Sequence, residues 1–289
     1  MIIDSHIHLY PSELNRDPAA WAAKSGEAHW AALCVRRRAD GQAVQSFPSL
    51  DELLREMDRT GVARALLLGW YWEKPETCRW QNRFFATCVR AHPDRLMAFA
   101  ALNPNAGHWE TLRELHRARD EGLIGIGELS PHSQHFAVDD PVFREVLTLA
   151  ADWKMAVNLH VTDPEGREYP GRVATPPEDF VELAQSFPGV RFVLSHWGGL
   201  LPLRDASVLN LANILYDTAA SPLIYAADIW QRFMAVVPSE RVLFGSDFPL
   251  NLYPKMDPEA AMARFIAEAR AGGANDAVLG RNAERLLTN

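Results

Sequence analysis

The sequence has few cysteines and no long apolar run, and both scarcities exclude classes of protein. Its 289 residues include three cysteines, Cys34, Cys78 and Cys88, none in a C-x-x-C pair. This suggests neither a disulfide framework nor a thiolate metal site, and we expect reduced, buried thiols. No apolar run approaches the ~18 residues of a membrane span, and the chain opens with no basic segment leading into an apolar one. We therefore expect no membrane partner and a cytoplasmic location.

Basic residues are rarely clustered. The net charge is −8, and the compact basic run is Arg36, Arg37 and Arg38. Such a balance does not favour nucleic acid as a partner. The run has two interpretations: a solvated stretch of loop or helix, or a clamp in which Arg36, Arg37 or Arg38 holds a substrate carboxylate.

The apolar segments alternate with helical patterns in a way that predicts a single domain. The hydrophobic fraction of 48% and the charged fraction of 23% are ordinary for a globular protein. Buried strands are predicted at 1–8, 62–69, 95–102, 124–129, 155–161, 190–195, 214–217 and 241–246. Helices are predicted at 50–60, 76–91, 108–121, 141–153, 177–187, 202–211, 222–236, 257–271 and 275–287.

Eight strands separated by helices imply parallel pairing, and eight such units close into a (β/α)8 barrel spanning 1–289. A doubly wound open sheet is the alternative. The difference matters because a closed barrel places the first and last strands side by side. Residues 11–48 show no sustained periodicity, and we interpret them as an insertion with one or two short helices. Their aromatic content favours an ordered lid over the barrel mouth.

Histidines and carboxylates occur at the predicted carboxyl ends of several strands. Barrel enzymes build their active sites on this face. In the first strand, His6 and His8 are two residues apart, so their side chains point to the same side. Each of these residues alone could be an ordinary hydrogen-bonded or capping group, but their joint placement predicts a metal centre. The set comprises His6 and His8 (strand 1), Glu128 (strand 4), His160 (strand 5), His196 (after strand 6) and Asp247 (after strand 8).

Imidazole and carboxylate ligands without thiolate favour Zn²⁺, with Mn²⁺, Fe²⁺, Co²⁺ or Ni²⁺ as alternatives. Asn158 shares a strand face with His160, which suggests a hydrogen-bonding group one layer below the site. The sequence leaves open whether one or two ions bind.

Several longer motifs resemble the amidohydrolase superfamily, in the amidohydrolase-related branch that includes aminocarboxymuconate-semialdehyde-decarboxylase-like enzymes. They are Asp-Ser-His-Ile-His at 4–8, Ala-His-Pro-Asp-Arg at 91–95, Phe-Ala-Ala-Leu at 99–102, Ser-His-Trp-Gly-Gly at 195–199, Phe-Gly-Ser-Asp-Phe-Pro at 244–249 and Gly-Arg-Asn-Ala-Glu-Arg-Leu-Leu at 280–287. The resemblance covers nearly the whole chain and implies a barrel metalloenzyme. It implies that His6, His8, His160 and Asp247 bind one metal. It also implies that His196 acts on substrate or binds a second ion.

Glu128 fits this resemblance less clearly. Some superfamily members have a bridging lysine carbamate or glutamate at the end of strand 4, whereas many decarboxylase-like members have no carboxylate there. Glu128 is therefore either a metal ligand or a carboxylate that caps the loop or orients a histidine. A bridging Glu128 would favour two metals and hydrolysis.

Two enzyme classes and one non-enzymatic role compete. In a hydrolase, Asp247 would accept the proton of water and His196 would support the developing oxyanion while a lactone, ester or amide is cleaved. In a non-oxidative decarboxylase or hydratase of an unsaturated or aromatic carboxylic acid, the metal would hold substrate oxygens and His196 or Asp247 would move a proton. A metal- or ligand-binding protein without turnover is the minor alternative. Release of carbon dioxide separates the first two.

The substrate is expected to be a small molecule. Trp70, Trp72 and Trp197 follow strand ends and are predicted either to line an apolar pocket or to pack beneath the insertion. His132 is predicted to contact substrate or to face solvent. A homo-oligomer is possible, but periodicity does not reveal one.

Overall fold

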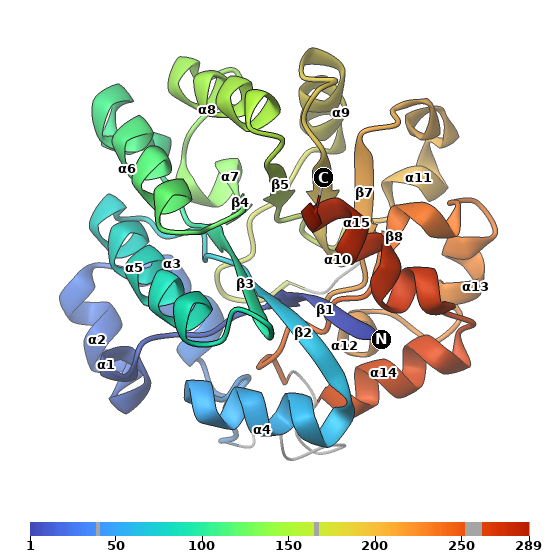
Figure 1. The fold of residues 1–289 in the computed structure, drawn as a ribbon, viewed down its shortest axis with the longest axis horizontal. Coiled ribbons are helices and arrows are strands. Elements are labelled where there is room, and N and C mark those ends of the chain that lie inside the picture. Colours follow the sequence, from blue (N-terminus) through green and yellow to red (C-terminus); the bar gives the residue numbers. More distant parts are fainter. Residues whose placement is uncertain (39–40, 165–167, 252–261, 289) are drawn as a thin grey trace.

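The computed structural model describes residues 1–38, 41–164, 168–251 and 262–288, and its centre is an eight-stranded parallel sheet in the order β1 to β8 (Figure 1). The strands are β1 (Ile2–Ile7), β2 (Val62–Leu67), β3 (Leu96–Ala100), β4 (Gly125–Leu129), β5 (Ala156–Leu159), β6 (Phe192–Leu194), β7 (Ile214–Asp217) and β8 (Val242–Leu243).

Backbone contacts between β1 and the segment after β8 close the sheet. Ser5 N donates to Phe244 O at 2.9 Å, Asp247 N donates to His6 O at 2.9 Å, and Ile7 forms a parallel bridge with Phe248. The fold is therefore the predicted (β/α)8 barrel in one domain, and the open-sheet alternative is wrong.

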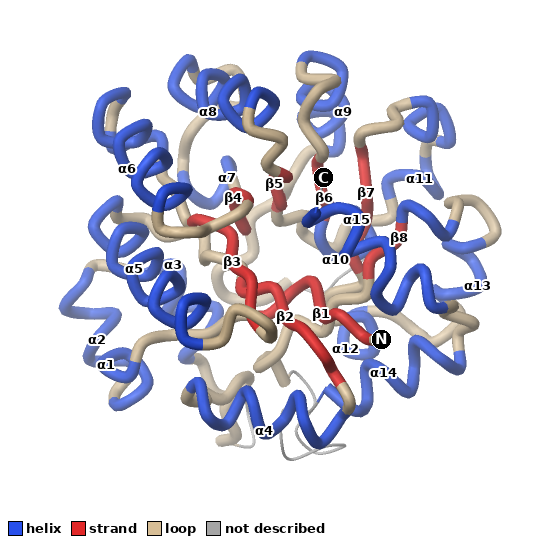
Figure 2. Tube along the Cα trace, viewed as in Figure 1, coloured by secondary structure: helices blue, strands red, loops and turns tan. Residues whose placement is uncertain are grey.

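Helices form a ring around the strands, and loops join the two layers (Figure 2). The main ones are α4 (Leu50–Thr60), α5 (Pro75–Ala91), α6 (His108–Asp120), α8 (Pro141–Asp152), α9 (Pro177–Ser186), α13 (Ile229–Met234) and α14 (Met262–Ala271). Shorter ones are α7 (Pro131–Gln134), α10 (Ser195–Gly198), α11 (Leu201–Arg204), α12 (Ser221–Ile224) and α15 (Asn282–Thr288). Local signals set their ends: α4 begins with a capping box between Ser49 and Glu52, and Gly61 ends it in the left-handed conformation. Among these described helices, none is long and apolar enough to cross a membrane.

Three predicted helices are interrupted. The one at 202–211 is α11 followed by a 3-10 turn at Ala206–Asn210, because the Asp205 side chain accepts the Ser207 amide and starts a new turn. The one at 222–236 divides into α12 and α13, since Tyr225 is extended. The one at 275–287 is a π-helix at Ala277–Arg281 that continues into α15. The start of the helix predicted at 257–271 lies outside the described residues.

The insertion at 11–48 has more helices than predicted. It contains α1 (Ser12–Arg16), α2 (Pro18–Ser25), α3 (Ala28–Trp30) and a π-helical turn at Ala31–Val35. Its aromatic side chains join those that follow β2, with Trp21 stacked on Trp80 at 5.0 Å between ring centroids. The buried Glu27 carboxylate also accepts the backbone amides of Glu73, at 2.8 Å, and Lys74, at 3.1 Å. Packing and hydrogen bonds therefore fix the insertion to the loop after β2.

Candidate metal centre

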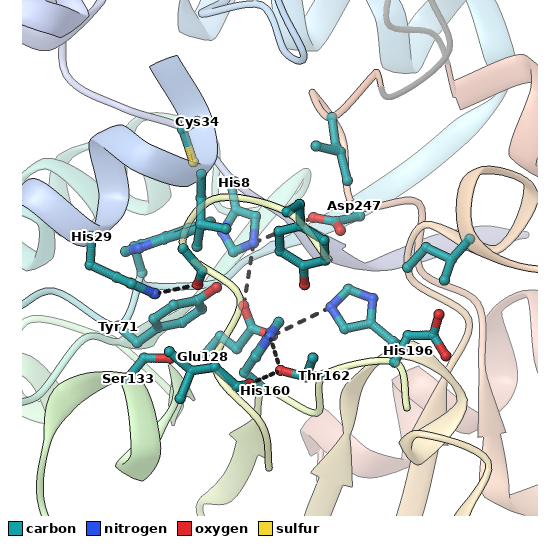
Figure 3. A pocket seen from close by; sticks show the side chains of 18 of the residues that line it. His8, His29, Cys34, Tyr71, Glu128, Ser133, His160, Thr162, His196 and Asp247 are labelled. Carbon is teal, nitrogen blue, oxygen red and sulfur yellow. Dashed lines mark hydrogen bonds and ion pairs between the residues drawn. The ribbon is translucent and has the colours of Figure 1, made fainter. Parts of the chain in front are cut away.

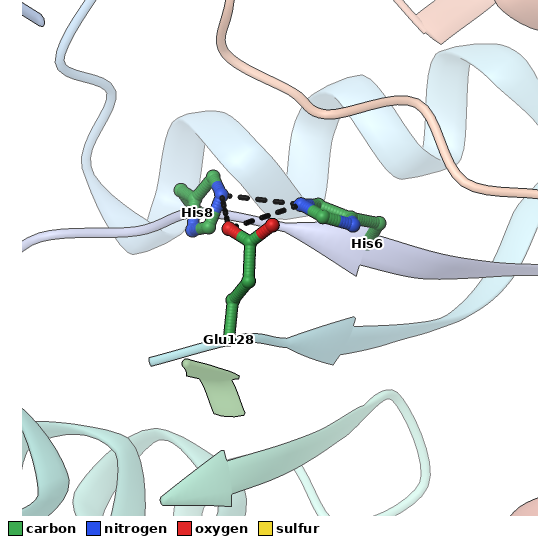
Figure 4. A group of neighbouring side chains, drawn as sticks. All are labelled: His6, His8 and Glu128. Atoms are coloured by element: carbon green, nitrogen blue, oxygen red, sulfur yellow. Dashed lines mark hydrogen bonds and ion pairs between the residues drawn. The ribbon is translucent and has the colours of Figure 1, made fainter. Parts of the chain in front are cut away.

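The predicted residues come together at the carboxyl ends of the strands. His6 and His8 belong to or directly follow β1, and Glu128 lies on β4 (Figure 4). His160 follows β5, His196 follows β6 and Asp247 follows β8. All except His160 are less than a tenth exposed. Five strands thus contribute imidazoles or carboxylates to one buried place.

His6 and His8 point the same ring nitrogen at a common point. His6 Nδ1 contacts Asp217 Oδ2 at 2.9 Å, and His8 Nδ1 contacts the carbonyl oxygen of Leu68 at 3.3 Å. Both partners are acceptors, so each Nδ1 carries the hydrogen in the neutral ring. The two Nε2 atoms then present lone pairs to each other at 3.2 Å. Lone pairs this close need a cation or a proton between them.

The two carboxylate oxygens of Glu128 face different imidazoles. Oε2 lies 3.5 Å from His8 Nε2 and 3.8 Å from His6 Nε2. Oε1 lies 3.0 Å from His160 Nδ1 and 3.9 Å from His196 Nε2. In the described residues, two groups therefore have metal-ligand spacing, and they share Glu128: His6, His8 and Glu128, and Glu128, His160 and His196. The resemblance had assigned His160 to one set with His6, His8 and Asp247, whereas the structure places it beside Glu128 and His196.

Asp247 reaches the first group from the closing seam of the barrel. Its Oδ1 lies 3.5 Å from His8 Nε2 and 3.7 Å from His6 Nε2. Gly245 makes this approach possible, because a Cβ there would lie 2.7 Å from His6 Cβ. Asp247 itself adopts a left-handed φ of 63°, which costs energy for a residue with a side chain. Barrel closure thus holds this carboxylate against the two histidines.

His196 is presented by a left-handed turn. His196 and Trp197 have φ values of 55° and 58°, and Gly198 and Gly199 both have 57°. Neither glycine has room for a side chain, since a Cβ would lie 2.6 Å from Tyr216 or 2.7 Å from Val161, respectively. The Ser-His-Trp-Gly-Gly motif is therefore explained by the backbone path that this histidine needs.

Asp217 is a site residue that the sequence interpretation missed. This fully buried carboxylate ends β7 and accepts His6 Nδ1 at 2.9 Å and Asn158 Nδ2 at 3.3 Å on Oδ2. Its Oδ1 accepts the backbone amides of His196 and Ala219, each at 3.0 Å. Asp217 therefore orients His6 and His196 together. Its position at the end of a predicted strand could have marked it as a site residue, but none of the sequence motifs includes it.

Burial and charge set the protonation of these groups. Burial alone would lower the pKa of His6, but the Asp217 and Glu128 carboxylates outweigh it and raise this pKa to about 10. Burial opposes ionisation of Glu128, yet the His160 and His6 charges hold its pKa well below the usual range. Burial lowers the pKa of His196. The site thus favours ionised carboxylates around a positive charge, which a divalent cation would also supply.

A cavity of about 480 Å³ opens onto this cluster (Figure 3). Its wall includes His8, Glu128, His160, His196 and Asp247, and also Tyr71, His29 and Cys34. Of the predicted substrate contacts, Trp70 and Arg36 line it, and the Trp70 ring lies 4.9 Å from that of His8. Tyr71, the next residue in the chain, also lines the cavity and stacks on Trp70 at 4.4 Å between ring centroids.

The other predicted substrate contacts lie elsewhere. Trp72 and Trp197 are fully buried: Trp72 Nε1 donates to Gln81 at 2.6 Å, and Trp197 packs edge-on against Trp230 at 4.7 Å. His132 pairs with Asp179 at 2.7 Å. None of these three, nor Arg38, is among the described residues of the cavity wall. For Trp72 the packing alternative is correct, because its ring contacts Trp21 and Trp30 of the insertion. Trp197 is also a packing residue, but it packs against α13 and not beneath the insertion.

Comparisons with known structures agree with the fold. 5-Carboxyvanillate decarboxylase LigW from Sphingomonas paucimobilis superposes with a TM-score of 0.72 at 18% identity, covering 99% of this chain and 98% of that one. A probable 2-pyrone-4,6-dicarboxylic acid hydrolase from Acinetobacter baumannii gives 0.67 at 15% identity, covering 100% and 99%. 4-Oxalomesaconate hydratase from Rhodopseudomonas palustris gives 0.66 at 18% identity, covering 99% and 95%. No curated protein matches this chain significantly.

These three proteins are named for three different reactions: decarboxylation, hydrolysis and hydration. The shared barrel fold therefore does not indicate which reaction this chain catalyses. Family membership rests on the sequence itself. The family model described as amidohydrolase matches residues 3–288, and the resemblance inferred from the motifs is confirmed. The chain therefore belongs to the amidohydrolase family and is a metal-dependent enzyme of that family.

Proposed function

We propose that this enzyme is a hydrolase with two divalent metal ions, one on each side of Glu128, and that it cleaves a lactone, ester or amide of a small organic molecule. The observation that carries the proposal is the division of the Glu128 oxygens between two pairs of imidazoles. One ion would bind His6, His8, Asp247 and Glu128. The other would bind Glu128, His160 and His196.

The donor set fits such ions. Two Nε2 lone pairs converge at 3.2 Å beside two carboxylates, and hydrogen bonds on the opposite nitrogens hold both rings in this tautomer. Imidazole and carboxylate without thiolate suit Zn²⁺ first, with Mn²⁺, Fe²⁺, Co²⁺ and Ni²⁺ as alternatives. In the second group Glu128 and His196 are buried and His160 is partly exposed, and the group faces the cavity through His160 and His196.

Divalent ions in such a site supply electrophilic activation of water and of a carbonyl oxygen. The protein side chains then move protons and hold the substrate. Asp247, itself one of the proposed ligands, lines the cavity and would accept a proton from water. The lowered pKa of His196 keeps its ring neutral near pH 7, so it can bind an ion or contact the carbonyl oxygen. The 11–48 insertion, whose residues form part of the cavity wall, would act as the lid that limits entry of water.

A second candidate is decarboxylation or hydration of a small carboxylic acid. It is supported by the LigW decarboxylase and the oxalomesaconate hydratase among the similar structures. It would need one metal and would leave Glu128 to orient His160, with which it makes the shorter contact of 3.0 Å. Hydrolysis ranks first because both Glu128 oxygens face histidine pairs.

The test is metal content per chain by mass spectrometry, on protein purified without chelator, for wild type and Glu128→Ala. About two ions falling to about one is expected. Without Glu128 the first ion would keep His6, His8 and Asp247, whereas the second would keep only His160 and His196. Glu27→Gln is the matched control, since Glu27 is an equally buried glutamate away from the cavity wall, and it should keep both ions. One ion in wild type and Glu128→Ala alike would overturn the two-metal proposal. Release of carbon dioxide from carboxylic acids, without hydrolysis of lactones or esters, would favour the second candidate.

A further inference from the structure

Two loops far apart in the sequence build one part of the cavity wall together. The insertion contributes His29, Leu33 and Arg36, and the loop between β5 and α9 contributes Tyr169 and Gly171. His29 Nε2 contacts Gly171 O at 2.8 Å, and a Cβ on Gly171 would lie 3.0 Å from Leu33 Cγ. The two loops are therefore in direct contact, and Arg36 sits at their junction with its guanidinium carbon 5.3 Å from the centre of the Tyr169 ring.

Arg36 is the one lysine or arginine among the described residues of this wall. Its Nε is buried and has no hydrogen-bond partner within the described part of the chain. The nearby arginines differ. Arg37 is exposed and donates to Gly41 O at 2.8 Å, and Arg172 donates to Glu168 and to Asp163 O, each at 3.1 Å. Among these three arginines, only Arg36 lines the cavity, and its Nε donates its hydrogen to no described partner.

This arrangement leaves a positive charge that needs an anion. Among the described residues, three acidic groups of the wall have partners other than Arg36: Glu128 and Asp247 face the histidines, and Glu168 pairs with Arg172. A guanidinium and a carboxylate are both planar, and two parallel hydrogen bonds can join them. The Tyr169 ring stabilises the same cation through its face. A single cation matches a carboxylate better than a phosphate dianion.

We infer that the substrate carries a carboxylate in addition to the group that reacts at the metal centre, and that Arg36 binds this carboxylate and so determines specificity. The inference rests on the proposed function for the reacting bond. It narrows the substrate class to small organic acids with a hydrolysable bond, held between Arg36 and the metal centre. A neutral ester or lactone would leave the guanidinium unpaired, which costs binding free energy.

Isothermal titration calorimetry on the metal-loaded full chain tests this inference without turnover. The probes are isophthalate, terephthalate and adipate, which offer one carboxylate to the metal and a second one at different separations. Each probe is compared with its monoamide, which keeps the first carboxylate and replaces the second by a neutral group. The variants are Arg36→Gln and Arg36→Lys, with Arg37→Gln as the matched control from the same run.

For at least one dicarboxylate, Arg36→Gln is expected to lower affinity by about 10- to 100-fold, the range for hydrogen bonds to a charged group, and to leave its monoamide nearly unchanged. Arg36→Lys should lie between, because it keeps the charge without the planar fork. Arg37→Gln should bind like wild type. Equal losses for diacid and monoamide in Arg36→Gln, unchanged diacid affinity, or no binding of any diacid to wild type would each overturn the inference.

The two proposals can fail separately. If the chain binds one metal and releases carbon dioxide, the proposed hydrolysis is wrong, but the dependence of diacid binding on Arg36 stands. If two metals bind and lactones are cleaved while Arg36→Gln binds diacids like wild type, the hydrolase proposal stands and the carboxylate requirement is wrong.

Discussion

Replacing Asp217 by Asn should weaken metal binding without any change in a metal ligand. Asp217 is fully buried and accepts four hydrogen bonds, from His6 Nδ1, Asn158 Nδ2 and the amides of His196 and Ala219. An asparagine has the same shape but one acceptor oxygen, and its NH₂ group must face two of these donors.

The loss of metal affinity depends on whether the new NH₂ group faces His6 or the two backbone amides. If the NH₂ group turns to His6, then Nδ1 becomes an acceptor and the hydrogen moves to Nε2, the atom that points at His8. If it turns to the amides, His6 keeps a weaker, neutral hydrogen bond and the backbone at His196 loses its support. Loss of such an orienting partner typically lowers metal affinity by about 10- to 100-fold. That range corresponds to about 1.4 to 2.7 kcal/mol.

The assay is competition between the protein and a chromogenic chelator for Zn²⁺, with circular dichroism as a check that the variant is folded. Asp228→Asn serves as the control, because the Asp228 side chain is exposed and makes a surface ion pair with Arg232 at 3.9 Å. Wild-type affinity in a folded Asp217→Asn protein would refute the reasoning, since it would mean that the His6 tautomer does not depend on this carboxylate.

Three further changes test other parts of the structure. Asp247→Asn should preserve the fold and lower kcat by roughly 100- to 10,000-fold, as expected for loss of a general base; steady-state kinetics that match wild type would exclude this role. Gly245→Ala should lower the free energy of unfolding by about 1 to 3 kcal/mol in chemical denaturation, since the new methyl would lie 2.7 Å from His6 Cβ, whereas Gly189→Ala, with 3.4 Å to its nearest atom, should not. Burial raises the pKa of Glu27, so its ionised form is disfavoured in the folded state. The stability of wild type relative to Glu27→Gln should therefore fall as pH rises from the ordinary glutamate pKa of 4.5 through the raised pKa. Denaturation curves with a constant difference between pH 4.5 and 7 would contradict this sign.

The barrel and most of the cluster could be predicted because their signals are local. Each strand is a short apolar run, and His6, Glu128, His160 and Asp247 each stand at the end of one. The barrel rule then brings these ends together without any knowledge of side-chain contacts. Helix boundaries were less predictable where side chains cap the backbone, as Asp205 does at the break between α11 and the following 3-10 turn.

The finer geometry of the site could not be predicted from the sequence, because it depends on the direction in which each side chain points. The sequence does not decide whether Glu128 is a metal ligand or a capping group. The structure shows its Oε2 facing His8 and its Oε1 facing His160. Trp72 and Trp197 follow strand ends as Trp70 does, yet only Trp70 lines the cavity. Residue spacing places an aromatic near a barrel mouth, but the rotamer and its neighbours decide whether the ring faces the cavity or the core.

The closing seam explains why strained residues and site residues coincide. Asp4 Oδ1 accepts the amides of both His6, at 3.1 Å, and Ser246, at 3.0 Å, so one buried carboxylate joins the first strand to the segment after the last. The same segment holds Asp247 at a φ of 63° and hydrogen-bonds its amide to His6 O. A left-handed aspartate persists only where the surroundings compensate its cost, and here the compensation comes from residues more than two hundred positions away. The proposed ligands at the seam are thus correctly placed only in the closed barrel. A bound cation would contact both sides of the seam and would therefore stabilise its closure.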